Sequence, residues 1–354
     1  MNKTKPVMSV LALTMINVIA IDSLRSIPMS ATYSFSLLFY YIICALLFFI
    51  PSALVSAELT TGWPQNGGIY VWVREAFGKP AAFTVIFIQW IYNICWYPTI
   101  LSLLAATLAY VINPELANNT WYMLAIVFVT YWLITIVTLR GMHISSMLST
   151  ATAIIGTLIP MAFITILGII WLLQGKPINM DISFKAFLPD LKPGNLVLLT
   201  GVLYSLVGME MSAQMPFAIL ITQGIVFSII CLVFLVMPTV NSSFWILSNL
   251  TSQLALSCYI FIFAAAIRLR YKFPEVKRSY RIPFGNFGMW IVGLAGILAS
   301  VFTVLIGFVP PSQIDVGNLK FYEMFLIVGF VGFYLISLLI YKTQKCFIAK
   351  LPSA

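Results

Sequence analysis

The chain consists of long apolar stretches separated by short polar connections. Each stretch has about the 20 residues that a helix needs to cross the hydrocarbon core of a bilayer. Lipid offers the backbone no hydrogen-bond partner, and the stretches lack the short alternation of barrel strands, so we expect all of them to be helical. Hydropathy and helix breakers predict ten spans: Val7 to Ala31, Ser34 to Ala57, Ala81 to Ile112, Trp121 to Leu139, Ser145 to Gln174, Leu196 to Gln214, Pro216 to Met237, Phe244 to Leu269, Met289 to Phe308 and Tyr322 to Tyr341.

The composition agrees with a membrane protein that has no separate soluble domain. Of the 354 residues, 61% are hydrophobic and 8% are charged, whereas a soluble domain carries about 25% charged residues. Ten spans of roughly 20 residues use about 200 positions and leave the remainder for ends and connections. We therefore predict an all-α polytopic membrane protein with a single transmembrane domain over residues 1–354.

The basic residues predict the orientation of the chain. Fourteen of the 19 Lys and Arg residues lie in connections on one side of the predicted spans, and five lie on the other side. Because short cytoplasmic loops carry an excess of Lys and Arg, both termini are predicted to be cytoplasmic. The net charge of +9 is thus explained by topology, without a nucleic-acid partner. Six basic residues are predicted to contact anionic lipid: Arg268, Arg270, Lys272, Lys277, Arg278 and Arg281.

Several classes of chemistry are excluded by the residues present. His143 is the single histidine, so a histidine-cluster metal site is impossible, and neither a phosphate-binding GxxxxGK[ST] loop nor a metalloprotease HExxH motif occurs. The five cysteines show no metal or redox spacing. Four of them lie in apolar stretches and are interpreted as small core residues: Cys44, Cys95, Cys231 and Cys258. We therefore expect no enzyme activity, no cofactor and no metal.

Two acidic residues inside predicted spans are candidates for function, because ionisable groups are costly in a bilayer. Asp22 lies in the run IAIDSLRSIP of the first span, and Glu210 lies in YSLVGMEMS of the sixth. Interrupted apolar segments at corresponding positions of two repeats indicate the midplane site of a secondary transporter. Opened backbone there can hold an α-amino and an α-carboxylate group. The predicted substrate-binding residues are Ala20, Ile21, Asp22, Ser23, Tyr204, Gly208, Met209 and Glu210.

Each of these acidic residues also has a structural interpretation. Arg25 follows Asp22 by three residues, so the two side chains can form a local ion pair near the outer interface. Glu210 can mark a helix end at the inner surface. Both alternatives stay open at this point. A group of aromatic residues in the third span, from Trp90 to Tyr97, likewise fits either a substrate path or simple packing.

The connection between the sixth and seventh spans is unusual. From Leu196 to Met237 the chain has no Lys or Arg, and its only charged residue is Glu210. The two spans abut, and a turn must fit within residues 211–216. Pro216 suits the first turn of the following helix, where its missing N–H is not needed. Every other connection on the inner side carries at least one basic residue.

The segment between the second and third spans has the pattern PxxGGxYxWVxxAFG over residues 64–78. Physically it fits a short helix at the inner interface, with Tyr70 and Trp72 at headgroup depth. The pattern resembles the hallmark of the amino acid/polyamine/organocation transporter superfamily. Residues 204–210 are similar to the broken sixth helix of that superfamily. Residues 268–283 and 310–314 resemble the C-terminal part of its bacterial glutamate/γ-aminobutyrate antiporter branch.

This resemblance implies an inverted-repeat, leucine-transporter-like fold of two five-helix repeats followed by two trailing helices. Members usually have twelve spans, and about ten are counted here. At Gln214 and Met215 the resemblance passes directly from the sixth helix of the family to the ninth, so the end of the sixth helix and the whole seventh and eighth would be missing. The chain then divides into a first repeat (7–174), an incomplete second repeat (196–269) and two trailing helices (289–341).

The function implied by the resemblance is amino-acid transport across the cytoplasmic (inner) membrane of a bacterium. The expected mechanism is antiport of an acidic or zwitterionic amino acid by alternating access. The partners are then the small-molecule substrate and the lipid bilayer. The alternative is a transport-inactive remnant, or a membrane partner protein that does not itself transport, because the missing loop removes parts of the moving structure.

Overall fold

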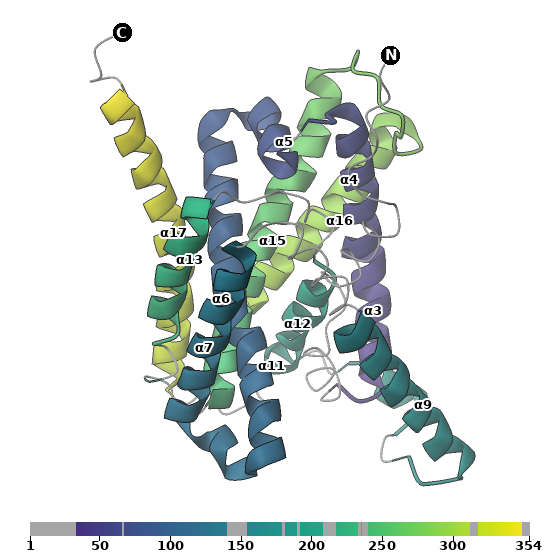
Figure 1. Cartoon of the computed structure of the whole chain (residues 1–354). Coiled ribbons are helices and arrows are strands. Elements are labelled where there is room, and N and C mark those ends of the chain that lie inside the picture. Colours follow the sequence, from purple (N-terminus) through teal and green to yellow (C-terminus); the bar gives the residue numbers. More distant parts are fainter. Residues whose placement is uncertain are drawn as a thin grey trace, which may run out of the picture.

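The computed structural model describes residues 33–65, 67–139, 154–178, 181–189, 192–207, 217–232, 235, 240–311 and 318–348. Every regular element in these ranges is helical, and the long helices stand side by side as a bundle (Figure 1). The elements are α3 (Ser36–Cys44), η1 (Ala45–Phe49), α4 (Ile50–Gly62), α5 (Gly68–Phe77), α6 (Lys79–Ile112), η2 (Pro114–Asn118), α7 (Thr120–Leu139), η3 (Ile154–Leu158), α9 (Ile159–Leu173), α10 (Phe184–Phe187), α11 (Pro193–Leu196), α12 (Leu198–Ser205), α13 (Phe217–Ile230), α15 (Val240–Lys272), α16 (Gly285–Ile306) and α17 (Leu319–Ile348).

Seven helices in the described ranges are long and apolar enough to cross a membrane. They correspond to seven of the ten predicted spans and confirm a multi-pass, all-helical membrane protein. The first predicted span, Val7 to Ala31, lies outside the described residues. The sixth and seventh correspond to α12 and α13, which are shorter than a full span over the residues described. The total of ten spans therefore stays a prediction.

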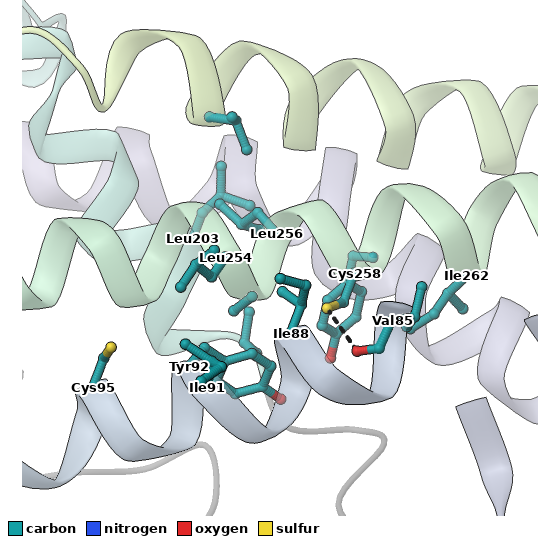
Figure 2. Packing of buried hydrophobic residues seen from close by; sticks show 14 of the residues in the cluster. Val85, Ile88, Ile91, Tyr92, Cys95, Leu203, Leu254, Leu256, Cys258 and Ile262 are labelled. Carbon is teal, nitrogen blue, oxygen red and sulfur yellow. Dashed lines mark hydrogen bonds between the residues drawn. The ribbon is translucent and has the colours of Figure 1, made fainter. Parts of the chain in front are cut away.

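Helix α15 lies at the centre of the bundle (Figure 1). In its most apolar 18-residue window 83% of the residues are buried, a larger share than in any other of the seven helices. Figure 2 shows it packed along α6, where the Cys258 thiol donates to the carbonyl oxygen of Val85 at 3.7 Å. As predicted, Cys258 is a small core residue, and so are Cys44, Cys95 and Cys231, which are buried and free.

Three polar residues of α15 join it to its neighbours. Asn249 bonds Thr200 of α12 and Tyr322 of α17, and the Gln253 amide donates to the Val304 carbonyl of α16. The Tyr334 hydroxyl of α17 donates to Ser257 at 2.6 Å. Asn249, Gln253 and Ser257 follow one another at intervals of four residues, so they share one face of α15. We call them the polar stripe. Such interhelical bonds contribute on average about 0.6 kcal/mol in a membrane.

Glycines bring α15 and α16 into close contact. A Cβ atom built on Gly296 would lie 2.2 Å from a ring carbon of Phe263, and one built on Gly293 would lie 2.7 Å from Ile267. Phe263 is fully buried, so its ring has no free space to enter. Small residues are favoured between membrane helices because they let two backbones approach. The close packing of α16 on α15 therefore depends on these glycines.

We expect Gly296→Val to lower the free energy of unfolding by about 1–3 kcal/mol, because the new side chain must displace the buried ring of Phe263. Gly332→Val is the matched control, since Gly332 lies in the membrane helix α17 and has nothing within 4 Å of its Cβ position. Unfolding of the purified protein in detergent, followed by circular dichroism, measures both. Equal losses in the two variants would contradict the proposed packing role.

Candidate functional site

The candidate site lies at the C-terminal end of α12. Hydropathy predicts a span from Leu196 to Gln214 and the sequence predicts an interruption in it near Gly208; the helix ends at Ser205. Leu206 and Val207 then form a tighter turn, in which their N–H groups bond the carbonyls of Leu203 and Tyr204. A helix that stops inside an apolar stretch leaves carbonyl groups at a depth where lipid cannot bond them. Such backbone is tolerated only where protein or a polar cavity surrounds it.

The neighbours of α12 supply polar groups at both of its ends. Near its start, the Thr200 hydroxyl donates to Asn249 Oδ1 of α15 at 2.9 Å, and both residues are buried. At its end, Ser205 Oγ lies 3.5 Å from the hydroxyl of Tyr41 on α3. These contacts hold the short helix between α3 and α15, so the position of its open end is set by side-chain hydrogen bonds as well as by packing.

Some buried polar atoms of α15 are not satisfied. Within the part of the chain that the structure describes, Ser248 Oγ and Gln253 Oε1 have no hydrogen-bond partner. Leaving a buried donor or acceptor unpaired costs about 1–3 kcal/mol. Gln253 belongs to the polar stripe that bonds α12, α16 and α17, and Ser248 precedes its member Asn249. They are therefore polar groups of the bundle interior that a ligand or water can satisfy.

Of the eight predicted substrate-binding residues, the structure describes Tyr204. It lies in the last turn of α12, half-buried against the apolar core. The other seven lie outside the described residues, namely Ala20, Ile21, Asp22, Ser23, Gly208, Met209 and Glu210. The structure therefore does not test whether the two predicted segments meet, and this site stays a prediction.

The aromatic residues of the third span are involved in packing. Tyr97 of α6 meets Tyr131 of α7 edge to face, with 5.4 Å between ring centroids. Tyr131 in turn stacks on Phe227 of α13 at 3.8 Å. This stack joins three helices, which supports the packing interpretation for Tyr97. Trp90 differs, because its buried indole N–H has no hydrogen-bond partner among the described residues.

A buried ion cluster that sequence analysis missed lies where α4 and α15 end. Glu58, near the end of α4, accepts hydrogen bonds from Arg270 Nη2 at 2.7 Å and Nε at 3.1 Å. It also accepts from the backbone N–H of Ile282 at 2.8 Å, and Arg278 Nε lies 3.5 Å away. The side chains of Glu58, Arg270 and Arg278 are at most 2% exposed. We call these three residues the inner ion cluster.

The cluster fixes the connection between α15 and α16. Arg270 also donates to the carbonyls of Ile282 and Gly285, and Arg278 donates to those of Leu269 and Phe273 at the end of α15. Burial lowers the pKa of the Arg278 guanidinium, an effect that the nearby Glu58 carboxylate opposes. One carboxylate thus holds the ends of α4 and α15 and the start of α16 together.

One expectation for this region is corrected. Arg270 and Arg278 were predicted to contact lipid, but their side chains are buried against Glu58; Arg268, Lys272, Lys277 and Arg281 are exposed. The short helix α5 forms as predicted, and its Trp72 is 4% exposed and packs in the protein core; the depth of Trp72 in the membrane stays a prediction. The sequence contains a signal for the cluster, namely an acidic residue directly after an apolar span. Glu58 follows the predicted end of the second span by one residue, and the helix continues through it to Gly62.

Replacing Glu58 with Gln should lower the free energy of unfolding by about 3–5 kcal/mol, because two buried guanidinium groups lose their counter-charge. Glu75→Gln is the control, because the Glu75 side chain forms an ion pair with Arg74 and is 32% exposed. For this variant we expect the free energy of unfolding to fall by less than about 1 kcal/mol. Unfolding in detergent, with both variants purified in parallel, measures the difference. A Glu58→Gln protein as stable as the control variant would contradict the role of the cluster.

The fold defines an all-helical, multi-pass membrane protein. Comparison with known families specifies the class. The chain belongs to the amino acid permease family, whose model matches residues 7–215 and 214–331. Membership in this family implies a leucine-transporter-like fold, and it makes the protein a transporter rather than an enzyme.

Three relatives illustrate the range of similarity. An uncharacterised transporter of Legionella pneumophila is 37% identical over 455 aligned residues, which cover 97% of this chain and 98% of the relative. A glutamate/γ-aminobutyrate antiporter of Lactococcus lactis is 23% identical, covering 89% of this chain and 86% of that protein. A probable polyamine transporter of Arabidopsis thaliana is 46% identical over 50 residues, which cover 14% of this chain and 10% of that protein.

The alignments also show a discontinuity. The alignment to the Legionella protein has 455 positions and this chain has 354 residues, so at least 101 positions (455 minus 354) face gaps in this chain. The family model matches in two pieces that meet at residues 214–215. These two residues lie at the charge-free junction, where the sequence resemblance passes from the sixth helix of the family to the ninth.

Proposed function

We propose that the chain descends from an antiporter of acidic or zwitterionic amino acids in the inner membrane of a bacterium, with both termini in the cytoplasm. The observation that carries this proposal is the end of α12 at Ser205, inside a stretch apolar enough to span. A transporter needs a polar site at the midplane of the membrane, and an interrupted helix supplies one without charged side chains.

The chemistry of the open helix end suits an amino acid. The C-terminal carbonyls of a helix carry a partial negative charge, so the end of α12 favours a substrate ammonium group. Backbone N–H groups that are not bonded within a helix favour a carboxylate. We assign these roles to the backbone around Gly208 and Met209, with Glu210 as a gating residue. Residues Ala20 to Ser23 form the opposite wall of the proposed site.

The similarity to the Lactococcus antiporter supports an acidic or zwitterionic substrate. The match covers most of both proteins at low identity, so it supports the substrate class and leaves the individual amino acid to experiment. The excess of basic residues in the connections on the side of the inner ion cluster supports cytoplasmic termini. No resident metal or cofactor is part of the proposal.

The discontinuity suggests that two membrane helices are missing. Taken together, the at least 101 positions that face gaps in this chain are enough for two spans of about 20 residues with their connections. An even number fits the contact between Thr200, near the start of α12, and Asn249, in the first third of α15. If both helices begin on the same side of the membrane, an odd number of spans separates them, and α13 supplies one.

The gap also favours a second function. If the missing helices carry parts needed for alternating access, the chain is a transport-inactive remnant or a membrane partner that does not transport. Sequencing the gene across the codons for Gln214 and Met215 and weighing the native protein would show whether the cell makes this short form.

The direct test is counterflow in proteoliposomes. Vesicles that contain the purified chain are loaded with unlabelled glutamate, γ-aminobutyrate or a neutral amino acid, and uptake of the labelled compound is measured. The antiporter proposal predicts saturable exchange that needs an amino acid inside. Absence of exchange with every amino acid, from protein that is folded by circular dichroism, would favour the remnant.

Glu210→Gln should reduce exchange at least about tenfold, equivalent to about 1.4 kcal/mol, because the substituted amide cannot act as a charged gate. Glu323→Gln is the control, since Glu323 is exposed near the start of α17. Initial exchange rates at several substrate concentrations measure both variants. Similar rates in the two would remove Glu210 from the proposed site.

A further inference from the structure

Helix α12, whose end forms the candidate site, is too short to fix its own position. It has eight residues, Leu198–Ser205, and helices shorter than about 12 residues are marginal by themselves. Its position therefore comes from its neighbours, which include α3, α11, α15 and α16. Apolar contacts tolerate small shifts, whereas a hydrogen bond requires a narrow range of distances and angles. The bonds from α12 to other helices thus determine where its open end lies.

Three buried side chains connect α12 to α17 through α15. Thr200, in the first turn of α12, bonds the side-chain amide of Asn249 at 2.9 Å, and the other end of that amide bonds the hydroxyl of Tyr322 on α17. The three residues are at most 2% exposed. Because the amide is planar and bonded at both ends, it cannot rotate without breaking one of these bonds. We call Thr200, Asn249 and Tyr322 the polar relay.

The end of the polar relay on α17 is itself held in place. The side-chain oxygen of Asn318, directly before α17, accepts from two backbone N–H groups of the first turn at 3.0 and 3.3 Å. Asparagine is among the best residues for this capping role. The N–H of Tyr322 bonds the Asn318 carbonyl at 3.0 Å. Further along α17, Tyr334 bonds α15 and Ser337 contacts α6. Tyr322 therefore projects from a capped turn of an anchored helix.

The open end of α12 lies close to the relay along the helix. Ser205 follows Thr200 by five residues, which is about 7.5 Å at 1.5 Å per residue. A bond in the first turn of so short a helix constrains the depth and tilt of the whole helix, including the carbonyl groups at its end. Helix α17 (yellow) runs along one edge of the bundle (Figure 1), and in the proposed division of the chain it is a trailing helix outside both repeats.

We propose that Tyr322 is a positioning residue: through Asn249 it sets where the end of α12 lies, so that the trailing helix α17 determines the geometry of the candidate site without touching it. The consequence for a substrate rests on the proposed function, whereas the constraint on α12 does not. An ordinary structural bond would instead stabilise all helices of the bundle alike. The two roles differ in which backbone amides they protect from hydrogen exchange.

Tyr322→Phe removes one hydroxyl group and keeps the ring. We expect the amide hydrogens of residues 198–207 to exchange at least about tenfold faster in this variant, because a buried amide side chain loses a partner and α12 opens more easily. The amides of α6 and α15 should keep their exchange rates. Hydrogen exchange of the purified protein in detergent, followed by mass spectrometry, measures all three helices in one experiment.

Tyr334→Phe is the matched control. It also removes a hydroxyl of α17 that bonds the polar stripe of α15, at Ser257, but the Ser257 hydroxyl donates to the Leu254 carbonyl of its own helix rather than to α12. We expect this variant to leave hydrogen exchange in α12 unchanged. Equal acceleration of α12 in the two variants, or equal acceleration of every helix in Tyr322→Phe, would overturn the proposal.

Thr200→Val breaks the relay at its other end and keeps the shape of the side chain. Since groups in one hydrogen-bond network are not independent, adding Tyr322→Phe to Thr200→Val should accelerate α12 no further. Full multiplication of the two effects would show that Tyr322 acts by another path and would overturn the proposal. If Tyr322→Phe does not fold, Thr200→Val alone decides: faster exchange over residues 198–207 supports the relay, and unchanged exchange refutes it.

Counterflow tests the consequence for the site. In a chain that exchanges amino acids, Tyr322→Phe should raise the KM for the substrate with little change in the maximal rate, and Tyr334→Phe should change neither. An unchanged KM in Tyr322→Phe would overturn the role of Tyr322 in the site. Hydrogen exchange needs no transport. Selective loosening of α12 in a chain without counterflow would therefore refute the antiporter and support the relay.

Discussion

Helix association in a bilayer cannot rely on burying apolar side chains, because lipid solvates them as well as the protein interior does. The bundle therefore depends on hydrogen bonds and close backbone packing, and α15 supplies both. Its polar stripe bonds α12, α16 and α17, and the glycines of α16 pack against Phe263. Its last turn adds Arg270, which reaches Glu58 on α4. Helices α4, α5, α6, α16 and α17 contact this central helix, and so does the short α12 whose end forms the candidate site.

Hydropathy was sufficient to predict the helical membrane class and the places of seven long helices, because lipid allows few alternatives to helix. The motif over residues 64–78 was specific enough to predict the family, which the family match confirms. The side-chain partners of charged residues were harder to predict. Glu58 was separated from its span by a hydropathy boundary at Ala57, and Arg270 was assigned to the membrane surface from its charge. Both assignments failed because a window average cannot detect a pair separated by 212 residues.

The candidate site was predictable only in part. Sequence reasoning placed an interruption near Gly208, and α12 ends three residues earlier at Ser205. The polar stripe was overlooked, although its four-residue spacing is visible in the sequence and identifies one face of a helix. Whether Asp22 and Glu210 approach each other depends on residues outside the described part. Their roles still rest on the cost of placing a charge in a membrane span.

The buried arginines of the inner ion cluster enter two different arguments. Arg270 and Arg278 count toward the basic excess from which cytoplasmic termini are predicted, and that rule applies to the chain while it inserts, before its helices have packed. After folding, the same guanidinium groups are inaccessible and neutralised in part by Glu58. A charge count therefore describes the nascent chain better than it describes the finished surface. Residues that direct insertion can be reused as internal structure once insertion is complete.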